Sequence, residues 1–593
     1  MTAATVHGLV AYSGPDPDAA RRTIETLTPA LNVAVSHNSR TIVATLGSGN
    51  TTKLAATNGS AAAFFGSAAQ GCTSNPTSLL DAGPDDVVAV GFGADGELVA
   101  AAGRGSHRLF VHRTANGATW IASSLHVLRR VAPGLTLDRT YEDFLLGFGF
   151  VPEPHSMYQR VEVMKPGTRT HTGTSANVTA LTYAANASCD RNEIIDSLHE
   201  ALIGTIADQA GNQRRHAVLL GGFDSALVAA VLVGLGHEVE TYTFRFADPT
   251  YVQRNVDMLT DHLGIRHHWV DFDSSVIASN LRGFAAVFTQ PGAQPHYQIH
   301  TLHAARQIAA DGHNHIFTGD GCDAIFLGYP TVSRRAAIAA ATKRMPSALT
   351  RLAVGTLSTG IVERRLGHVA RMARGTLRNR LLGETVGAHL PTQVFDAAAL
   401  GRLRTSIGPA QAETVLAIRT RLATGLEHLN RTQLAFNGNG LNGQSKVKVD
   451  GAVAATGVAQ ASPFMHARLR TFVSGIPFEY LRSAGSSASS AGKEILVDMV
   501  RRHGLLPDVI IDQPKQSPSD SPVDGWYMNE LRTEILDQLG DLPFGWNERY
   551  VEDLLAPKAA EAWYRNKVSL SHHTMQVIGL LSSYASFNRN PGT

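Results

Sequence analysis

The segment that most constrains the fold of this chain reads HAVLLGGFDSA from His216 onward. An apolar run with the length of a buried strand leads into Gly221 and Gly222. Asp224 and Ser225 then open a helix rich in Ala, Val and Leu. Glycines at such a turn let backbone N–H groups approach a phosphate, and the helix N-terminus adds a partial positive charge. The same letters also describe a plain tight turn with Asp or Ser as the N-cap. No Gly-Lys-Ser/Thr follows, so this is not the Walker pattern.

Strands and helices continue to alternate around this segment. Apolar residues at helical spacing predict a helix over 191–209. After the glycine pair, the pattern predicts a helix over 224–235 and a strand over 238–246. A helix over 252–263 and a strand over 267–272 follow. Because strands that alternate with helices are typical of βαβ units, we expect an α/β domain with a parallel sheet and added helices.

The first part of the chain has a different pattern. Short apolar runs between clusters of Gly, Asn, Asp and Ser predict antiparallel strands at the spacing of a meander, with a last hairpin over 163–177. We therefore expect an α+β antiparallel sandwich in a domain of residues 1–185, and the α/β domain in residues 190–593. Within the second domain, residues 334–433 are predicted to be mostly helical, and the low-complexity stretch 483–492 is predicted to be a mobile loop.

Composition excludes several classes of protein. The chain has 52 Lys+Arg against 50 Asp+Glu, which gives no reason to expect a nucleic-acid partner. Its 3 cysteines form neither a disulfide framework nor a Cys-x-x-Cys metal pair. The first residues lack the pattern of a signal peptide, and Asp224 and glycines interrupt the most apolar window, 217–236. We expect a cytoplasmic protein with no membrane span.

A second glycine-rich segment, HIFTGDGCDAIFLGYP, covers residues 315–330. A short strand ends there in Gly319, Asp320 and Gly321, and Asp323 stands three residues after Asp320. Two acidic residues beside a glycine-rich turn suit a Mg²⁺ ion that bridges nucleotide phosphates. The alternative is an Asx-type turn that caps a helix.

Together, the two segments resemble the asparagine synthetase superfamily. Residues 216–226 are similar to its pyrophosphate loop, Ser-Gly-Gly-x-Asp-Ser, and residues 315–330 are similar to Gly-Glu-Gly-x-Asp-Glu-x-Phe-x-Gly-Tyr. The resemblance implies a glutaminase-like (Ntn) first domain, then a PP-loop ATP pyrophosphatase domain that uses ATP and Mg²⁺. Further stretches resemble the family in the same order; they are residues 243–246, 264–271, 290–297, 450–464 and 506–526.

The resemblance also implies roles for single residues. Asp224 and Asp323 would hold Mg²⁺. Lys515 would be catalytic and stabilise negative charge in the transition states. Asp320 would lie near the incoming amine, where it either helps to deprotonate that amine or only caps a turn. The implied ATP and pyrophosphate contacts are Leu219, Gly221, Gly222, Asp224, Ser225, Phe246, Thr318 and Gly319.

Several positions depart from the family pattern. Glutamine-dependent members begin Met-Cys-Gly-Ile, whereas this chain has His7, Gly8, Leu9 and Val10 and no cysteine before Cys72. An imidazole cannot replace the thiolate nucleophile, so the first domain is predicted not to produce ammonia. Alanines in the second domain remove polar groups that would bind free aspartate. The substituted family positions there are Leu220, Ala324, Ala459 and Ala461.

These features favour an ATP-dependent carbon–nitrogen ligase that takes its amine from its own substrate. Family members without the cysteine include lasso-peptide cyclases and β-lactam synthetases. The length of 593 residues and the Asn-Gly-rich stretch 434–444 favour a lasso-peptide macrolactam synthetase. Its expected partners are a precursor core peptide and also a leader peptidase and a leader-binding protein. β-Lactam synthetase, ammonia-dependent asparagine synthetase and a catalytically inactive scaffold remain as alternatives.

Overall fold

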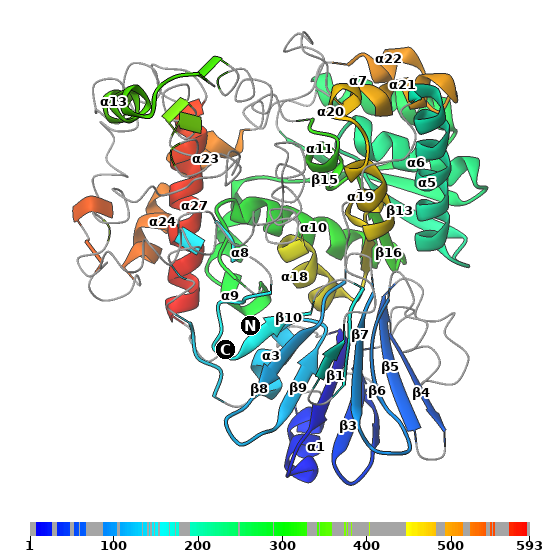
Figure 1. Ribbon diagram of the computed structural model, residues 1–593, viewed down its shortest axis with the longest axis vertical. Coiled ribbons are helices and arrows are strands. Elements are labelled where there is room, and N and C mark those ends of the chain that lie inside the picture. Colours follow the sequence, from blue (N-terminus) through cyan, green and yellow to red (C-terminus); the bar gives the residue numbers. More distant parts are fainter. Residues whose placement is uncertain are drawn as a thin grey trace.

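The computed structural model of the chain has an antiparallel β-sandwich and an α/β region beside it (Figure 1). The structure describes residues 7–26, 33–47, 52–57, 60–66, 87–103, 107–132, 134–138, 142, 145–146, 149–151, 154–164, 167–171, 174–176, 190–246, 250–288, 290–328, 338, 341–342, 344–357, 373–374, 376–377, 381, 403, 446–481, 493–513, 522–540, 546–547, 549–551 and 569–589.

In the part of the chain that the structure describes, the sandwich consists of two six-stranded sheets. The first has the order β10–β8–β9–β1–β3–β2, and the second β12–β11–β7–β6–β5–β4. Strands of the first sheet are β1 (Gly8–Ser13), β2 (Val33–His37), β3 (Thr41–Leu46), β8 (Phe110–Arg113), β9 (Thr119–Ala122) and β10 (Val161–Val163). Strands of the second are β4 (Thr52–Thr57), β5 (Ser60–Gly66), β6 (Val87–Phe92), β7 (Leu98–Ala102), β11 (Arg169–His171) and β12 (Thr174–Ala176).

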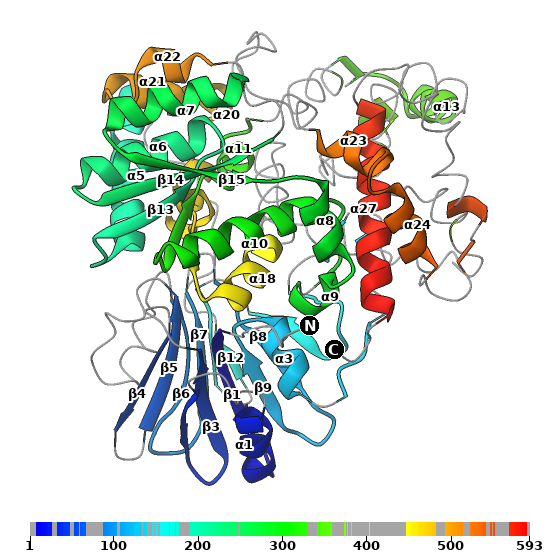
Figure 2. The same ribbon diagram turned by 180° about the vertical axis from the view of Figure 1, so that it is seen from behind.

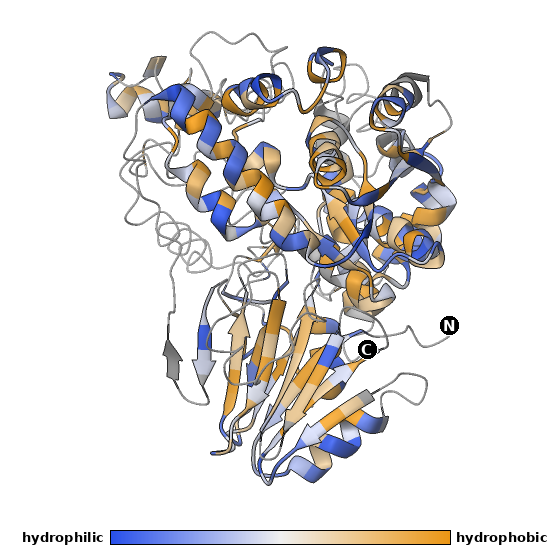
Figure 3. Ribbon diagram, turned by 90° about the vertical axis from the view of Figure 1, so that its right-hand side faces the viewer, coloured by the Kyte–Doolittle hydropathy of each residue, from blue (hydrophilic) through white to orange (hydrophobic). Residues whose placement is uncertain are grey.

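The alternation of side chains in β1 shows how the sandwich is layered. Leu9 and Ala11 point into the core between the two sheets. Val10 and Tyr12 point the other way, because successive residues of a strand face opposite sides, and join a second apolar cluster. The helices α1 (Pro17–Thr26) and α3 (Leu125–Val131) contribute to that cluster and cover the outer face of the first sheet. Figure 3 shows the apolar residues concentrated in the strands.

The predicted antiparallel architecture is confirmed, and so is the last hairpin, which is the pair of β11 and β12. The simple meander was only partly right. Strands β4 to β7 do follow one another across the second sheet, but β1 lies between β3 and β9 in the first. Strands that follow one another in the chain are neighbours in a sheet only roughly two-thirds of the time, so an N-terminal strand can lie in the middle of a sheet.

The α/β region contains a five-stranded sheet with the order β15–β14–β13–β16–β17, in which every neighbouring pair is parallel. Predicted strands and helices are confirmed to within about two residues at each end. The strands are β13 (Arg215–Leu219), β14 (Glu238–Arg245), β15 (Arg266–Asp271), β16 (His315–Thr318) and β17 (Ala459–Ala461). The helices around them include α5 (Arg191–Ala210), α6 (Phe223–Gly234), α7 (Thr250–Leu263), α8 (Ser274–Leu281), α10 (Pro295–Ala310), α11 (Cys322–Ile325) and α18 (Lys446–Thr456).

Helices cover both faces of this sheet. Val218 and Leu220 pack into a cluster with residues of α5, α6 and α7. Ala217 packs into a different cluster with residues of α10. Figure 2 shows α5, α6 and α7 on one side and α8 and α10 on the other. A strand of a parallel sheet that is covered on both faces has a continuous apolar sequence. The apolar run after His216 therefore predicts a strand of this kind.

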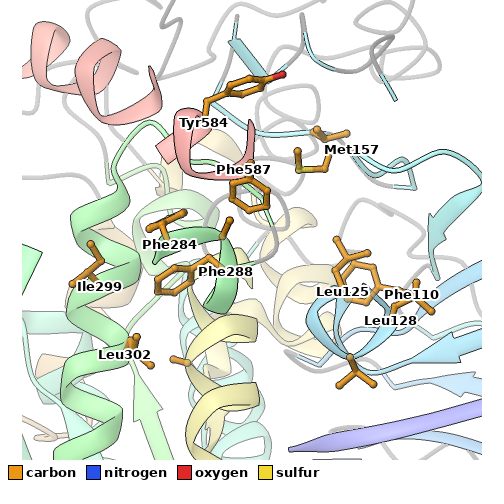
Figure 4. Close-up of a cluster of buried hydrophobic side chains, with 14 of the residues drawn as sticks. Phe110, Leu125, Leu128, Met157, Phe284, Phe288, Ile299, Leu302, Tyr584 and Phe587 are labelled. Carbon is orange, nitrogen blue, oxygen red and sulfur yellow. The ribbon is translucent and has the colours of Figure 1, made fainter. Parts of the chain in front are cut away.

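The C-terminal helices tie the two regions together. Helix α27 (Ser569–Arg589) packs with α9 (Phe284–Val287), α23 (Val523–Met528) and α24 (Arg532–Leu539). Figure 4 shows Phe284, Phe288 and Phe587 in one buried cluster with Met157 and Leu128 of the N-terminal region. The sandwich and the α/β region therefore share a continuous apolar core.

Other predictions lie wholly or partly outside the described residues. The stretches 434–444 and 483–492 are among them, and so is the expected boundary near residue 185, which stays a prediction. Of the helical stretch 334–433, the structure describes α13 (Ser347–Leu357) and a few single positions. Among the described helices, none is at once long and apolar enough to cross a membrane.

Candidate functional site

The two glycine-rich turns meet at the carboxyl ends of β13 and β16, which are neighbours in the parallel sheet. A Cβ added at Gly319 would stand 2.7 Å from the backbone nitrogen of Ser225 and 2.8 Å from Cβ of Asp224. Only a glycine therefore allows this close contact between the turns. Ligands of open α/β sheets bind beyond the carboxyl ends of the strands, so this contact marks the candidate site.

The turn after β13 is folded around one hydroxyl. The N–H groups of Gly221 and Gly222 donate to Oγ of Ser225 at 2.8 and 3.3 Å, and that hydroxyl donates to the Gly222 carbonyl at 3.1 Å. A Cβ at either glycine would meet no atom within 4 Å, so the outer side of the turn is open. The turn is thus both a capped helix start and an open cradle of glycine backbone.

Asp224 and Asp323, the predicted Mg²⁺ ligands, do lie together. Each is bound by the same cation, because Nζ of Lys493 is 2.5 Å from Oδ1 of Asp224 and 2.7 Å from Oδ1 of Asp323. The lysine side chain is 8% exposed, whereas the two carboxylates are 21% and 22% exposed. The ammonium therefore comes from the protein interior and neutralises two carboxylates at the edge of the site.

The charges in this group depend on one another. Burial alone would lower the pKa of Lys493, but Asp224, Cys322 and Asp323 outweigh that effect and hold the pKa well above its ordinary value. Burial raises the pKa of Asp224, against the pull of the ammonium. The pKa of the buried Cys322 thiol is also raised, by burial and by the Asp224 carboxylate, so this thiol stays protonated and hydrogen-bonds to Asp224.

The donor set can be tested against Mg²⁺. Among the described residues, no group of three or more His, Cys, Asp or Glu side chains could hold a metal. Mg²⁺ is commonly held by one or two carboxylates together with substrate phosphates and water. Asp224 and Asp323 fit an ion of that kind, which arrives with a nucleotide. They do not fit a metal bound by the protein alone, since the ammonium of Lys493 already lies between them.

Asp320 is held by a separate set of groups. Nζ of Lys448, on α18, is 2.6 Å from its Oδ1. The hydroxyl of Thr318 donates to its Oδ2 at 3.2 Å, and the amide of Gln460, on β17, approaches the same oxygen at 3.4 Å. The Ser462 hydroxyl donates to the Asp320 backbone carbonyl. The carboxylate is thus fixed by long-range partners, which goes beyond a local turn cap.

The remaining predicted contacts fall around the strand ends. Leu219 ends β13 and is half-buried, and Thr318 ends β16 and is buried. Phe246 follows β14, with its ring centroid 6.0 Å from that of Trp526 and 6.3 Å from that of Phe272. Trp526 belongs to the late stretch that resembles the family, so the fold brings this distant segment to the site. Lys515 lies outside the described residues.

The four positions of the second region that depart from the family pattern are buried. Leu220 lies in the apolar cluster under α6, and its N–H donates to the Tyr242 carbonyl at 2.8 Å. Its side chain therefore supports the sheet and does not face the open turn. Ala324, Ala459 and Ala461 are also buried.

The sequence analysis missed Lys493 and Lys448. A signal was present, because three carboxylates gathered at one sheet edge need positive charge nearby. Lys493 directly precedes the amphipathic helix α21 (Glu494–Arg502), and Lys448 is in α18. Their distance in sequence from the carboxylates, 269 residues for Lys493 and Asp224 and 128 for Lys448 and Asp320, left the partners undetermined.

A small cavity lies beside His7, the residue that stands in place of the cysteine in the Met-Cys-Gly-Ile pattern of the resemblance. Its volume is about 10 Å³, room for about one water molecule. The lining residues include no thiol, and the free cysteine that the structure describes is Cys322, in the other region. The cavity is lined by His7, Phe65, His107, Ser123, Ser124, Val449, Val453 and Ala454.

Fold and site together define an α/β protein with an antiparallel sandwich and a glycine-rich, acidic strand-end site. The family model for asparagine synthase matches residues 197–583, and the chain belongs to this family. The chain is also similar to asparagine synthetase [glutamine-hydrolyzing] 1 of Bacillus subtilis (strain 168), with 19% identity over 432 residues. The match spans 71% of this chain and 65% of that relative. The resemblance to the superfamily is thus confirmed.

Proposed function

We propose that this protein is an ATP-dependent carbon–nitrogen ligase that forms AMP and pyrophosphate. A substrate carboxylate attacks the α-phosphorus of ATP and releases pyrophosphate, which leaves an acyl adenylate. An amine then attacks the acyl carbon, loses a proton and displaces AMP, so that an amide remains. Family membership supports this reaction in general terms. The observation that carries it is the convergence of Asp224, Asp323 and Lys493 beside the open glycine turn.

Each group at the glycine turn has a role in this proposal. The N–H groups of Gly221 and Gly222, which donate to the Ser225 hydroxyl in this structure, are the proposed hydrogen-bond donors to the leaving pyrophosphate. Lys493 supplies a fixed positive charge that needs no reorganisation during the reaction. A Mg²⁺ ion brought with the nucleotide would be held by Asp224 and Asp323 and would neutralise phosphate charge. Lys515 remains the proposed second cation, on the resemblance alone.

The amine is proposed to belong to the substrate itself. By the resemblance, His7 stands where glutamine-dependent members have cysteine, and no thiol lines the cavity beside it. Buried alanines replace the family's polar groups at positions 459 and 461, which disfavours free aspartate. These observations favour an amine carried by the substrate. The length of 593 residues and the Asn-Gly-rich stretch 434–444 favour lasso-peptide macrolactam formation, in which a core peptide's N-terminal amine is joined to an Asp or Glu side chain. A leader peptidase and a leader-binding protein are the proposed partners.

The test uses the purified chain with ATP, Mg²⁺ and a leader-free core peptide. We expect a product lighter by one water, together with AMP and pyrophosphate, and no consumption of added glutamine. A peptide that stays linear while a small β-amino acid cyclises would show β-lactam synthesis instead. Asparagine formed from aspartate and ammonium would show an ammonia-dependent synthetase. Either result would overturn the proposed substrate class while retaining the ligase chemistry.

A further inference from the structure

His7, which directly precedes β1, contacts the turn between α18 and β17. The helix and the strand that this turn joins hold Asp320. The backbone N–H of His7 donates to the carbonyl of Ala454, near the end of α18, at 2.8 Å. A Cβ added at Gly457 would stand 2.6 Å from Nδ1 of the same histidine, and one added at Gly47 would also collide with that ring. The imidazole is therefore enclosed between a glycine of the sandwich and the glycine of this turn.

Both arms of that turn reach Asp320. In the α18 arm, Lys448 forms the ion pair with Oδ1 at 2.6 Å. In the β17 arm, the Gln460 amide lies 3.4 Å from Oδ2 and 3.2 Å from Oγ1 of Thr318. The position of the Asp320 carboxylate thus depends on how α18 and β17 are placed relative to β16.

Helix α18 is packed on two sides. Val449 and Val453, one helical turn apart, belong to the apolar core of the sandwich. A Cβ at Gly451 would stand 2.5 Å from the ring of Phe288, so this face of the helix touches the α/β region directly. A close-packed helix transmits displacement because side chains leave no slack around it.

We propose that His7 is a positioning residue for the candidate active site. Its ring fixes the turn between α18 and β17, and this turn holds Lys448 and Gln460 on the Asp320 carboxylate. The role of Asp320 toward the amine rests on the proposed function, whereas the mechanical coupling does not. In this arrangement, the sandwich serves the candidate active site through its fold.

The test measures the labelling rate of Lys448 by isotope-coded acetic anhydride and mass spectrometry. In the wild-type protein, this amine is held 2.6 Å from Oδ1 of Asp320 and its side chain is only 20% exposed, so labelling is slow. His7→Ala should raise the rate severalfold, toward that of Asp320→Asn. His7→Phe keeps a flat neutral ring beside a small cavity and should restore the wild-type rate.

A matched pair of glycine variants separates the effect of backbone strain from the effect of displacing the His7 ring. Gly457→Ala and Gly134→Ala impose similar strain, since φ is +71° and +73°, but at Gly134 no atom lies within 4 Å of the added Cβ. We expect rapid labelling of Lys448 in Gly457→Ala and slow labelling in Gly134→Ala. Thermal melts of all the variants confirm that each is folded.

Each outcome of these experiments either supports or overturns the proposed coupling. Unchanged Lys448 labelling in His7→Ala and Gly457→Ala would overturn the coupling, as would failure of His7→Phe to restore slow labelling. If the chain forms amides, His7→Ala should lower kcat for amide formation and leave the KM for ATP unchanged. If it forms none, the proposed function fails, yet the labelling result still decides the coupling.

Discussion

At the scale of single residues, the arrangement of Asp224, Asp323 and Lys493 is the most informative feature of the molecule. Two carboxylates share one buried ammonium, and all three groups are within ion-pair distance. Removing one partner from a buried charge group costs more than the pair contributes, because the remaining charges keep their desolvation without compensation. Among these three residues, Lys493 is therefore the one whose removal should lower the free energy of unfolding most.

Lys493→Met should therefore lower the free energy of unfolding by about 3 kcal/mol, the lower end of the range for buried pairs, because the carboxylates stay partly exposed. Urea denaturation measures this loss. MgCl₂ alone should partly restore the stability of the variant and leave the wild-type protein unaffected, because the ammonium then no longer occupies the place between the carboxylates. Lys493→Arg is the charge-conserving control. Equal Mg²⁺ effects on wild type and variant would contradict the proposed arrangement.

Alanine substitution at two glycines of the site should have different effects, one on folding stability and the other on nucleotide binding. Gly319→Ala brings a Cβ to 2.7 Å from the Ser225 nitrogen, so we expect a loss of about 1–3 kcal/mol in folding stability from overpacking. Gly221→Ala meets no atom within 4 Å and should fold normally, but its methyl group occupies the open side of the turn and should weaken nucleotide binding. Denaturation curves and calorimetric titration with a non-hydrolysable ATP analogue check both. A Gly221→Ala variant that binds the analogue as wild type does would show that phosphate lies elsewhere.

At the scale of elements, a network of buried histidines lies at the amino ends of the parallel strands. This is the end of the sheet opposite the candidate site. Nδ1 of His216, in β13, is 3.2 Å from Nδ1 of His315, in β16. Burial lowers the pKa of His216 to about 4, and also lowers that of His315. Burial alone would raise the pKa of Glu240, in β14, but hydrogen bonds from Arg215, His313 and His268 lower it to about 2.

These shifts predict acid sensitivity. Between pH 6.5 and 4 the unfolded chain protonates His216 and the folded protein does not, so stability falls as the pH falls. The lowered pKa of Glu240 extends the loss from about pH 4.5 toward pH 2. The His216 contribution is about 3 kcal/mol across its window, at about 1.4 kcal/mol per pKa unit. Urea denaturation at pH 7.5, 6 and 5 measures the part of this loss between pH 6.5 and 5, about 2 kcal/mol. Stability that does not change over this range would contradict the neutral, buried state of this histidine.

At the scale of the whole molecule, one apolar core joins the sandwich to the α/β region. Val10 and Leu128 share a cluster with Phe284, Ile299 and Tyr584. Val449 and Val453 of α18 are part of the sandwich core. Because neither region can be separated without exposing apolar surface to water, they should stabilise each other.

We therefore expect the full chain to unfold in one cooperative step. Tryptophan fluorescence reports both regions, since Trp120 lies in β9 and Trp269 in β15, and circular dichroism reports secondary structure. Coincident urea transitions from both probes would agree with the shared core. Two resolved transitions would show instead that the domains are energetically independent.

Local pattern was sufficient to predict the strands and helices from Arg191 to Asp271, because a continuous apolar strand followed by a glycine turn has few alternatives. The resemblance to the asparagine synthetase superfamily, and not the local pattern, implied that Asp224 and Asp323 would lie together, and the neighbouring parallel strands β13 and β16 bring them to one edge of the sheet. The local pattern missed Lys493 and Lys448, whose partners are set only by tertiary packing. It also missed the place of β1 within its sheet, because strand order is not encoded in local periodicity.

The central claim is that the site around Asp224 activates a substrate carboxylate with ATP. Isotope exchange between labelled pyrophosphate and ATP tests it most directly, since the exchange needs the adenylation step and no amine. We predict exchange that depends on the core peptide and that falls at least a hundredfold, by about 3 kcal/mol of transition-state stabilisation, in Asp224→Ala. Full exchange in Asp224→Ala, or no exchange with any carboxylate substrate in the wild-type protein, would contradict the claim.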